Sequence, residues 1–518
     1  MTDRFTTDVL ICGAGAAGLT LAVDLARRGV AFRIIEKSPE PFRGSRGKGI
    51  QPRSQEVFED LEVIDRLVAR GGIYPPQREH AADGGYADTP ITEPADPTPA
   101  EPYQIPLMSP QFITEAVLRE RLAELGQAVR FGCELVDVEQ DDGGVTARVA
   151  THDGEDTVRA RYLIGADGGR SFVRNALKID FPGKTLGIRA IVADVMLEGL
   201  TADAWHRFNV GSMEGQLAIC PLAGTDMFQI QAPIPLEGDV DLSATGLTEL
   251  AANRTDRADI KVRSVSWASA YNMNARLADR YREGRVFLVG DAAHIHPPTG
   301  GQGLNTSVQD SYNLGWKLGA VLSGAAPALL DTFEEERRPI AASVLGLSTK
   351  LLADAKDGSQ RRGREVRQLD LGYPESSLSL ENPERRGGVL AGDRAPDAPI
   401  AGAGGLPTRL FKLFQGPHWT LLGFGVQPSQ AIAPRANLHI HRFGLRGDIV
   451  DEAGHFREAY DPAPGDWFLV RPDGYIGAIV SSEHIADLEA YLDRVGLRRP
   501  KPDPATGATR VSIGLAAG

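Results

Sequence analysis

Three glycines near the start of the chain stand where a phosphate-binding turn would need them. Gly13, Gly15 and Gly18 follow a short apolar run and open a stretch of helical periodicity, and a second apolar run ends at Glu36. The first glycine permits a tight turn, the second lets the backbone approach a pyrophosphate, and the third lets helix and strand pack closely, while the acid accepts bonds from a ribose. A GxGxxG alone can be an ordinary tight turn, but in this context it predicts a βαβ unit that binds a dinucleotide.

Two later stretches place carboxylates and glycines after apolar β-runs. The first, YLIGADGGRSFVR, carries Asp167, and the second, GRVFLVGDAAHIHPPTGGQGLNTS, carries Asp291 at a strand end and then a glycine-rich turn into a helix that starts near Leu304. A β-turn supported by the side chains of Asp167 and Ser171 is the simpler interpretation of the first stretch, and it is compatible with a binding role.

The three stretches, in this order, resemble the class A flavoprotein aromatic hydroxylases, which include p-hydroxybenzoate, phenol and polyketide hydroxylases. The resemblance covers essentially the whole chain. It implies an α/β fold with a Rossmann-like βαβ FAD domain, an interleaved β-sheet substrate domain and a C-terminal thioredoxin-like domain. It also implies FAD as the cofactor and NAD(P)H as a transient co-substrate, since the sequence holds one dinucleotide fingerprint.

The resemblance assigns residues to the parts of FAD. Asp291 suits the ribityl hydroxyls, because a carboxylate would repel the phosphates. The glycine turn before Leu304 lets N–H groups approach the isoalloxazine edge, where the positive helix end would stabilise the anion of the reduced ring. Arg46 and Gln111 match positions that contact phosphate and ribityl groups, although a solvated charge and a helix cap are their structural alternatives.

Leu135 matches a backbone contact to adenine, and Asp167 lies in a motif associated with both FAD and NAD(P)H. The full set of predicted cofactor residues is Gly13, Gly15, Ala16, Ala17, Gly18, Glu36, Lys37, Arg46, Gln111, Leu135, Asp167, Asp291, Pro298, Gly301, Gly303, Leu304 and Asn305.

Other side chains raise the question of a metal or a catalytic base. His294 and His296 lie two apart beside prolines, but no third ligand has suitable spacing, so we expect no metal site. In the middle of the chain His206, Arg207 and Tyr271 could act on a substrate, yet core and surface roles are at least as plausible. We therefore assign no catalytic residue.

Composition excludes several classes of protein. The 518 residues are 42% hydrophobic and 24% charged, as in globular proteins, and the net charge of −13 argues against nucleic acid as a partner. Cys12, Cys133 and Cys220 form no CxxC pair, so we expect no disulfide and a reducing cytoplasm. The uncharged run from Val9 to Val23 is too short and too rich in glycine for a membrane span or a signal peptide.

The chain is long enough for two to four domains. We expect the FAD domain in two parts, 1–179 and 276–388, around a substrate domain at 180–275. A thioredoxin-like domain at 389–518 would be redox-inactive without CxxC and would support packing or a homodimer. The proline-rich segment 74–106 predicts a surface loop without a long helix, and 355–388 an exposed connector.

These features predict an FAD-dependent monooxygenase. By resemblance it would use NAD(P)H and dioxygen to hydroxylate an aromatic substrate, a phenol and more specifically a polycyclic polyketide or related natural product, through a flavin 4a-hydroperoxide. The alternatives are a Baeyer–Villiger oxygenation on the same scaffold, an FAD-dependent reductase or dehydrogenase without oxygen transfer, and a flavin-binding protein without enzymatic activity.

Overall fold

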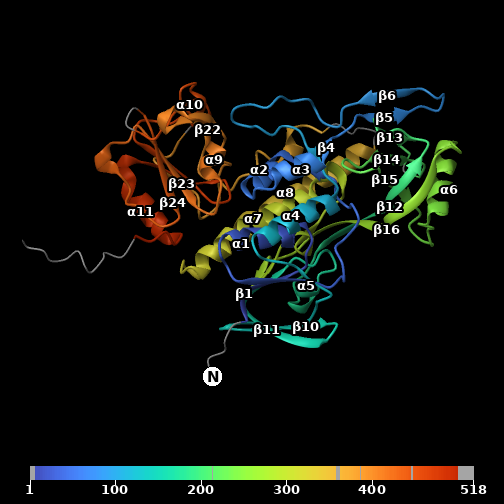
Figure 1. Cartoon of the computed structure of the whole chain (residues 1–518), viewed down its shortest axis with the longest axis horizontal. Coiled ribbons are helices and arrows are strands. Elements are labelled where there is room, and N and C mark those ends of the chain that lie inside the picture. The colour runs from blue at the N-terminus through green and yellow to red at the C-terminus, as the bar shows by residue number, and fades with distance from the viewer. Residues whose placement is uncertain (1–5, 213, 357–361, 386, 445–446, 500–518) are drawn as a thin grey trace, which may run out of the picture.

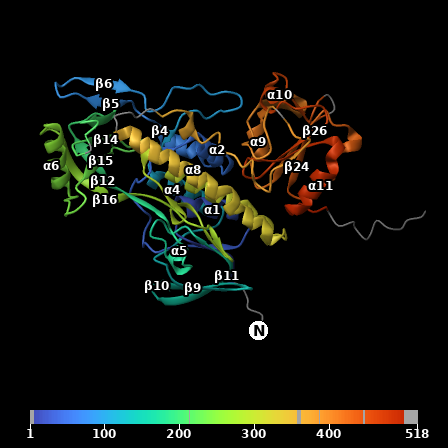
Figure 2. The same ribbon diagram turned by 180° about the vertical axis from the view of Figure 1, so that it is seen from behind.

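The computed structural model describes residues 6–212, 214–356, 362–385, 387–444 and 447–499, apart from the side chains of 354–356 and 428. In these residues the backbone forms three sheets of eight strands and one of three. The C-terminal sheet lies at one end of the molecule and a sheet of mid-chain strands at the other, with helices α7 and α8, drawn in yellow, between them (Figure 1). Seen from behind, α8 lies across the middle of the molecule and runs between the mid-chain sheet and the C-terminal unit (Figure 2).

The first sheet contains the βαβ unit predicted from the glycines. Strand β1 lies between β2 and β11 and runs parallel to both. Residues Val9, Leu10 and Ile11 of β1 are fully buried, as expected for a parallel strand covered on both faces. The strands are β1 (Thr7–Cys12), β2 (Phe32–Glu36), β8 (Arg130–Phe131), β9 (Glu134–Asp141), β10 (Gly144–Thr151), β11 (Gly154–Gly165), β17 (Arg282–Glu283) and β18 (Val286–Leu288). The accompanying helices are α1 (Ala16–Arg27), α2 (Pro52–Asp60), α3 (Ile64–Arg70), α4 (Gln111–Glu124), α5 (Phe172–Ala176), α7 (Gly303–Leu322) and α8 (Asp331–Lys356).

The second sheet is built mainly from mid-chain strands and has the order β19-β16-β12-β15-β14-β13-β5-β6. Its strands are β5 (Gln77–His80), β6 (Tyr86–Thr89), β12 (Gly183–Glu198), β13 (Trp205–Phe208), β14 (Leu217–Pro221), β15 (Phe228–Ile234), β16 (Lys261–Leu277) and β19 (His294–Ile295), and helix α6 (Ala244–Thr255) lies beside it. Strand β19 pairs with the end of β16, so the segment that carries Asp291 is joined to this sheet.

The segment 74–106, expected as a surface loop, supplies two of these strands. Its described residues contain no helix, but β5 and β6 form a hairpin, and β5 pairs in parallel with β13. The hairpin, in blue, extends the green sheet in Figure 1. A small sheet of β3 (Gly49–Ile50), β7 (Leu107–Met108) and β4 (Gly72–Ile73) lies at the base of the excursion. The hairpin is a pair of strands because β5 bonds to β13, which is distant in the chain, and no local sequence pattern shows that pairing.

The third sheet is C-terminal and mixed. Central strand β23 runs parallel to β24 and antiparallel to β26, and the hairpin β26–β27 leads to an amphipathic helix α11 that buries Leu488, Tyr491 and Leu492. Its strands are β20 (Leu380–Asn382), β21 (Pro399–Gly402), β22 (Pro407–Arg409), β23 (Trp419–Phe424), β24 (Leu438–Phe443), β25 (Ile449–Val450), β26 (Asp466–Val470) and β27 (Ile476–Ser481), with helices α9 (Leu410–Phe414), α10 (His455–Tyr460) and α11 (Ile485–Arg494). The expected domain limits stay predictions, and residues 500–518 lie outside the described residues.

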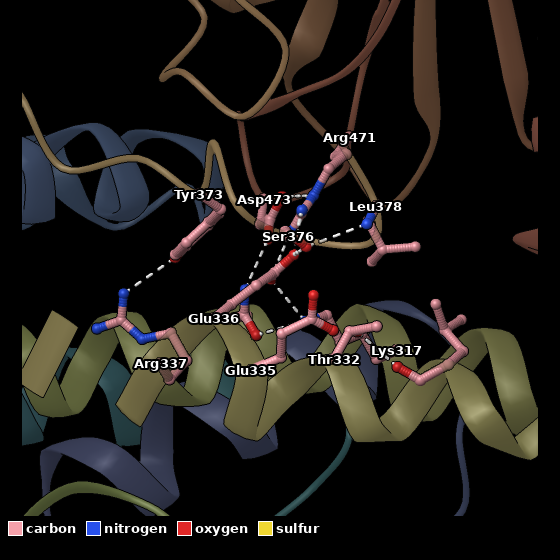
Figure 3. Close-up of polar contacts among 12 residues, drawn as sticks. Lys317, Thr332, Glu335, Glu336, Arg337, Tyr373, Ser376, Leu378, Arg471 and Asp473 are labelled. Carbon is pink, nitrogen blue, oxygen red and sulfur yellow. Dashed lines mark hydrogen bonds and ion pairs between the residues drawn. The ribbon is translucent and has the colours of Figure 1, made fainter. Parts of the chain in front are cut away.

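A buried charge network joins this C-terminal unit to α7 and α8. The carboxylate of Glu336 on α8 accepts hydrogen bonds from Arg471 at 2.7 Å and 2.9 Å and from Lys317 at 2.6 Å (Figure 3). Asp473 accepts from Arg471 and, at 2.9 Å, from the indole N–H of Trp316, whose ring lies edge-on to that of Trp419. Burial alone would raise the pKa of Glu336, but the charges of Arg471 and Lys317 outweigh it and hold the pKa below its usual range. Lys317 of α7 and Arg471 of the C-terminal unit thus share the buried carboxylate of Glu336 where the unit meets the two helices.

The described part of the expected connector is not uniformly exposed. Val366, Gln368 and Leu378 are buried. The hydroxyl of Ser376 donates to Glu336 at 2.7 Å, and Arg337 donates to the phenol oxygen of Tyr373 at 2.9 Å. The prediction of an exposed connector was therefore wrong for these residues: Gln368 bonds to Gln309 of α7, Leu378 shares a core with Trp316, and Ser376 and Tyr373 bond to α8. Residues 357–361 and 386 lie outside the described part of the chain.

Candidate functional site

The glycine turn leaves space at its middle position only. Gly13 has φ +107°, and a Cβ there would lie 2.2 Å from the carbonyl oxygen of Ala166. A Cβ on Gly18 would lie 2.0 Å from the carbonyl oxygen of Gly13, which shows how closely helix and strand approach. At Gly15 the nearest atom would be Glu115 Oε1, at 3.7 Å. The backbone at Gly15 and the first turn of α1, where Ala16 and Ala17 lie, can therefore approach an anionic ligand.

Glu36 is held at the end of β2 by two backbone amides. Its Oε2 accepts from the N–H of Ala14 and its Oε1 from the N–H of Ser38, both at 3.0 Å. This fixes the carboxylate beside the glycine turn, where each oxygen retains a lone pair for a ligand hydroxyl. The neighbouring Lys37 is exposed.

Sequence reasoning missed Glu115, which lies on α4 beside the same turn. Gln111, the first residue of α4, donates to Glu115 Oε1 at 2.8 Å, while Glu115 Oε2 is buried without a hydrogen bond among the described residues and lies 4.0 Å from the guanidinium of Arg119. Burial raises the pKa of Glu115 to about 7. Glu115 lies one helical turn after Gln111, but no motif includes it, and a glutamate in a helix of ordinary composition gives no signal in the sequence.

Replacing Glu115 with glutamine is expected to stabilise the protein above neutral pH. The pKa of a raised carboxyl lies higher in the folded than in the unfolded chain, so its stabilising contribution is full below the ordinary value of 4.5 and is lost as pH rises through about 7. The difference in unfolding free energy between Glu115→Gln and the parent is therefore expected to shift in favour of the variant by about 3 kcal/mol between about pH 5 and about pH 8. Urea unfolding at the two pH values measures it. Glu120→Gln, exposed on the same helix, is the control, and equal pH dependence in Glu115→Gln and the parent would contradict the assignment.

The Asp167 motif forms the supported turn expected of it. Asp167 Oδ2 accepts from the N–H of Val173 at 3.0 Å, and Ser171 caps α5 by accepting from the N–H of Arg174 at 2.9 Å. The Arg174 guanidinium donates to the carbonyl of Ala292 at 2.8 Å, which links this motif to the strand end that carries Asp291. Asp167 Oδ1 is buried without a partner in the described residues. The turn is therefore structural and still offers one acceptor.

The loop 290–305 begins with the short 3₁₀ turn Gly290–Ala292 and ends in the first turn of α7. The side chain of Asp291 is exposed, although loss of solvation within the surrounding protein raises its pKa. Asn305 ties the loop to a distant segment: it accepts from the N–H of Gln51 at 2.8 Å and donates to the carbonyls of Gly49 and Gly301. Asn305 thus shapes the loop.

Gly300 and Gly301, with φ +81° and +64°, make the bend that follows Pro298. Gln51 donates to the carbonyl of Gly300 at 3.0 Å, so both ends of this bend are fixed from the segment 47–51. Gly303 begins α7, and Leu304 faces Gly47. The bend leaves backbone N–H groups at the start of a helix, where they can approach the edge of a ring.

His294 belongs to a buried chain of polar contacts. Its Nε2 lies 2.7 Å from Asp310 Oδ2, and Arg337 donates to Asp310 Oδ1 at 2.8 Å. The ring of His296 stacks on that of His294, and burial lowers the pKa of His296 to about 3. Among the described residues no group of three or more His, Cys, Asp or Glu side chains could hold a metal ion.

The remaining predicted cofactor residues lie around the same region. Arg46 is exposed and its guanidinium lies over the rings of Phe42 and Trp267, 5.3 Å and 5.9 Å from their centres. Gln111 accepts from the N–H of Gly47 and is not the N-cap of α4, a position that Pro110 occupies. Leu135 lies on β9 with its side chain in the core.

A cavity of about 230 Å³ lies between the second sheet and the loop 290–305. The loop contributes Pro298 to Gly301, and the sheet contributes aromatic walls from Trp205, Phe208 and Tyr271. Of the three side chains considered from sequence, Arg207 and Tyr271 line the cavity. His206 instead bonds to His80 at 3.0 Å and to the carbonyl of Thr201 at 2.8 Å. The cavity therefore brings an apolar aromatic wall to the glycine bend.

Comparison with known proteins matches both parts of the chain to families. Residues 6–348 match an FAD binding domain, and residues 389–496 match the C-terminal domain of aromatic-ring hydroxylases. A flavin-dependent monooxygenase of Mycobacteroides abscessus is 40% identical over 94% of this chain and 99% of its own length. A 12-dehydrotetracycline 5-monooxygenase/anhydrotetracycline 6-monooxygenase of Streptomyces rimosus is 34% identical over 90% of this chain and 94% of its own.

Solved structures agree with these matches. Aklavinone-11 hydroxylase, in a ternary complex with FAD and aklavinone, superposes with a TM-score of 0.83 at 28% identity and covers 96% of this chain and all of its own. In the described residues of our chain, no helix is long and apolar enough to cross a membrane.

Proposed function

Because this chain belongs to the FAD-dependent aromatic-ring hydroxylases and is a flavin monooxygenase, we propose that it hydroxylates a polycyclic phenolic compound of polyketide type. The observation that carries the substrate class is the cavity lined by Trp205, Phe208 and Tyr271, which ends at the glycine bend 300–301. The relative named for 12-dehydrotetracycline and anhydrotetracycline and the hydroxylase solved with aklavinone support a fused-ring substrate.

FAD would lie along the edge formed by the glycine turn, Asp291 and the bend 300–301. The space at Gly15 fits the pyrophosphate, and the fixed Glu36 fits the adenosine ribose. The partnerless oxygen of Asp167 and the exposed carboxylate of Asp291 fit hydroxyl donors. A Cβ built on Gly290, the residue before Asp291, would lie 3.1 Å from Cβ of Ala17 in the first turn of α1, and Arg174 joins the Asp167 motif to Ala292; these contacts support the assignment as a proposal.

FAD, when bound, supplies reduction by NAD(P)H and activation of dioxygen. The chain's own residues do the rest: the apolar walls hold the aromatic ring and exclude water, and the helix start at Gly303 presents N–H groups to the pyrimidine edge. NAD(P)H would visit from outside, because one dinucleotide fingerprint occurs in the sequence. The proposal includes a homodimer. It also includes a cytoplasmic location, which is in keeping with the three unpaired cysteines.

Oxygen transfer is tested by following NAD(P)H oxidation with polyketide phenols under ¹⁸O₂. The expected result is substrate-stimulated oxidation and a product that gains one ¹⁸O atom, detected by mass spectrometry. Two results together would indicate the reductase instead. NAD(P)H would be oxidised in air as fast as under nitrogen with an artificial electron acceptor, and no phenol would give an oxygenated product. The comparisons do not favour that alternative.

A further inference from the structure

One side of the cavity combines its aromatic residues with positive charge. Besides Arg46 at the cofactor edge, the cations Lys48, Arg207 and Arg362 line it, while no Asp or Glu is among the described residues that do so. The three cations come from separate parts of the chain and converge on the side formed by the second sheet. Buried cations without a counter-charge are costly, so their convergence needs a reason.

Lys48 reaches this wall from the segment beside β3. It is 7% exposed, its ammonium donates to Gln229 Oε1 at 2.5 Å, and it lies 4.6 Å from the centre of the Trp205 ring. Burial lowers the pKa of Lys48. An amide and a ring face solvate the cation in part, but neither neutralises it.

Among the described residues, Arg207 and Arg362 also lack a carboxylate partner that would neutralise their charge. Arg207, 9% exposed on β13, donates to Gln77 Oε1 at 2.8 Å, and burial lowers its pKa to about 10. Loss of solvation also lowers the pKa of Arg362, with Tyr74 and Cys220 as the opposing neighbours. Within the described residues neither arginine forms an ion pair with a carboxylate.

The nearest acids do not compensate these charges. Asp194 lies behind Gln229, which donates to it at 3.3 Å; burial raises the pKa of Asp194, and its carboxyl acts on Lys48 only through space. Glu79 acts on Arg207 only through space. The cavity therefore holds excess positive charge against an aromatic wall.

We propose that Lys48, Arg207 and Arg362 form a subsite for an anionic oxygen group, a carboxylate or an ionised enol, carried by the aromatic substrate. The inference rests on the proposed function and narrows its substrate class. The aromatic residues Trp205 and Phe208 beside the cations favour a ring that carries the anion over a free ion. The phosphates of NAD(P)H share this chemistry, so the test must separate the two sources.

The test measures binding to the FAD-loaded enzyme by calorimetry at neutral pH, with two matched probe pairs. 3-Hydroxy-2-naphthoic acid is compared with its carboxamide, and 2-hydroxy-1,4-naphthoquinone, an ionised enol, with its methyl ether. At least one anion is expected to bind about tenfold or more tightly than its neutral partner. Lys48→Met and Arg207→Met are each expected to remove most of that preference, and Lys48→Arg to retain it.

Lys261→Met, at an exposed position of β16, is the control and is expected to keep the preference. Equal binding within both pairs, binding of neither member, or a preference that survives the Lys48→Met/Arg207→Met double variant would overturn the proposal. The proposal would also be overturned if the Lys48 and Arg207 variants kept the preference for the anionic probe but showed a higher KM for NAD(P)H in the absence of aromatic compound. That result would assign the cations to the phosphates of NAD(P)H. Because these titrations need no turnover, their failure is distinct from a failure to transfer oxygen.

Discussion

Glu336→Ala is expected to cost about 3–5 kcal/mol in unfolding free energy, because it leaves the buried Lys317 without a carboxylate and Arg471 with Asp473 as its one remaining anion among the described residues. Lys317 and Arg471 both donate to this carboxylate, and all three side chains are fully or nearly fully buried. Arg471 belongs to the C-terminal unit and Lys317 to α7, so the loss weakens the contact between them as well as each part. Denaturant unfolding measures the loss, and limited proteolysis is expected to cut first between α8 and β21.

The matched control is Glu335→Ala, one residue away on the same helix. Glu335 is exposed and bonds to Ser377, so its removal is expected to change the unfolding free energy by about 0.5 kcal/mol or less. Equal losses in the two variants would show that helix α8 tolerates no alanine there and that the buried network has no special role.

Gly18→Ala is expected to yield protein with little bound FAD. An added Cβ would lie 2.0 Å from the carbonyl oxygen of Gly13, so α1 must move away from β1 and carry the phosphate-binding turn with it. Overpacking of this size costs about 2–3 kcal/mol, which corresponds to about a 100-fold loss in affinity. The flavin content of the purified protein and a fluorescence titration of the apo form with FAD measure the effect.

Gly346→Ala controls for the change of residue. Gly346 is exposed within α8, and nothing lies within 4 Å of a Cβ built there. This variant is expected to keep full flavin content and to gain about 0.5–1 kcal/mol in stability, because alanine favours helix. Full flavin content in Gly18→Ala would contradict the assignment of the glycine turn to FAD.

The sequence predicted those parts of the site that depend on neighbours in the chain. Gly13, Gly15 and Gly18 carry their requirement in local backbone geometry, and Glu36 ends the strand that follows their helix. A linear pattern suffices for such residues, because strand, turn and helix together dictate where they lie.

The parts of the site that the sequence could not predict depend on contacts between residues that lie far apart in the chain. Lys48 meets Gln229, and Asp310 meets Arg337 and His294, through tertiary packing that leaves no period or motif. The hairpin β5–β6 was hidden for a related reason: the prolines around it favour a loop, and its edge pairs with β13, far along the chain. The resemblance to a family supplied Arg46 and Gln111, which residue types alone left as a surface charge and a cap.

The edge-on contact of Trp316 with Trp419 has an optical consequence. Of the five tryptophans, Trp316, Trp419 and Trp467 share the core where the C-terminal unit meets α7, whereas Trp205 lines the cavity and Trp267 lies beside Arg46. The intrinsic emission of the protein thus has two spatially separate sources. One set reports solvent entry when the C-terminal unit detaches, and the other lies where an incoming aromatic ligand can quench it, so a single spectrum can follow both events without a label.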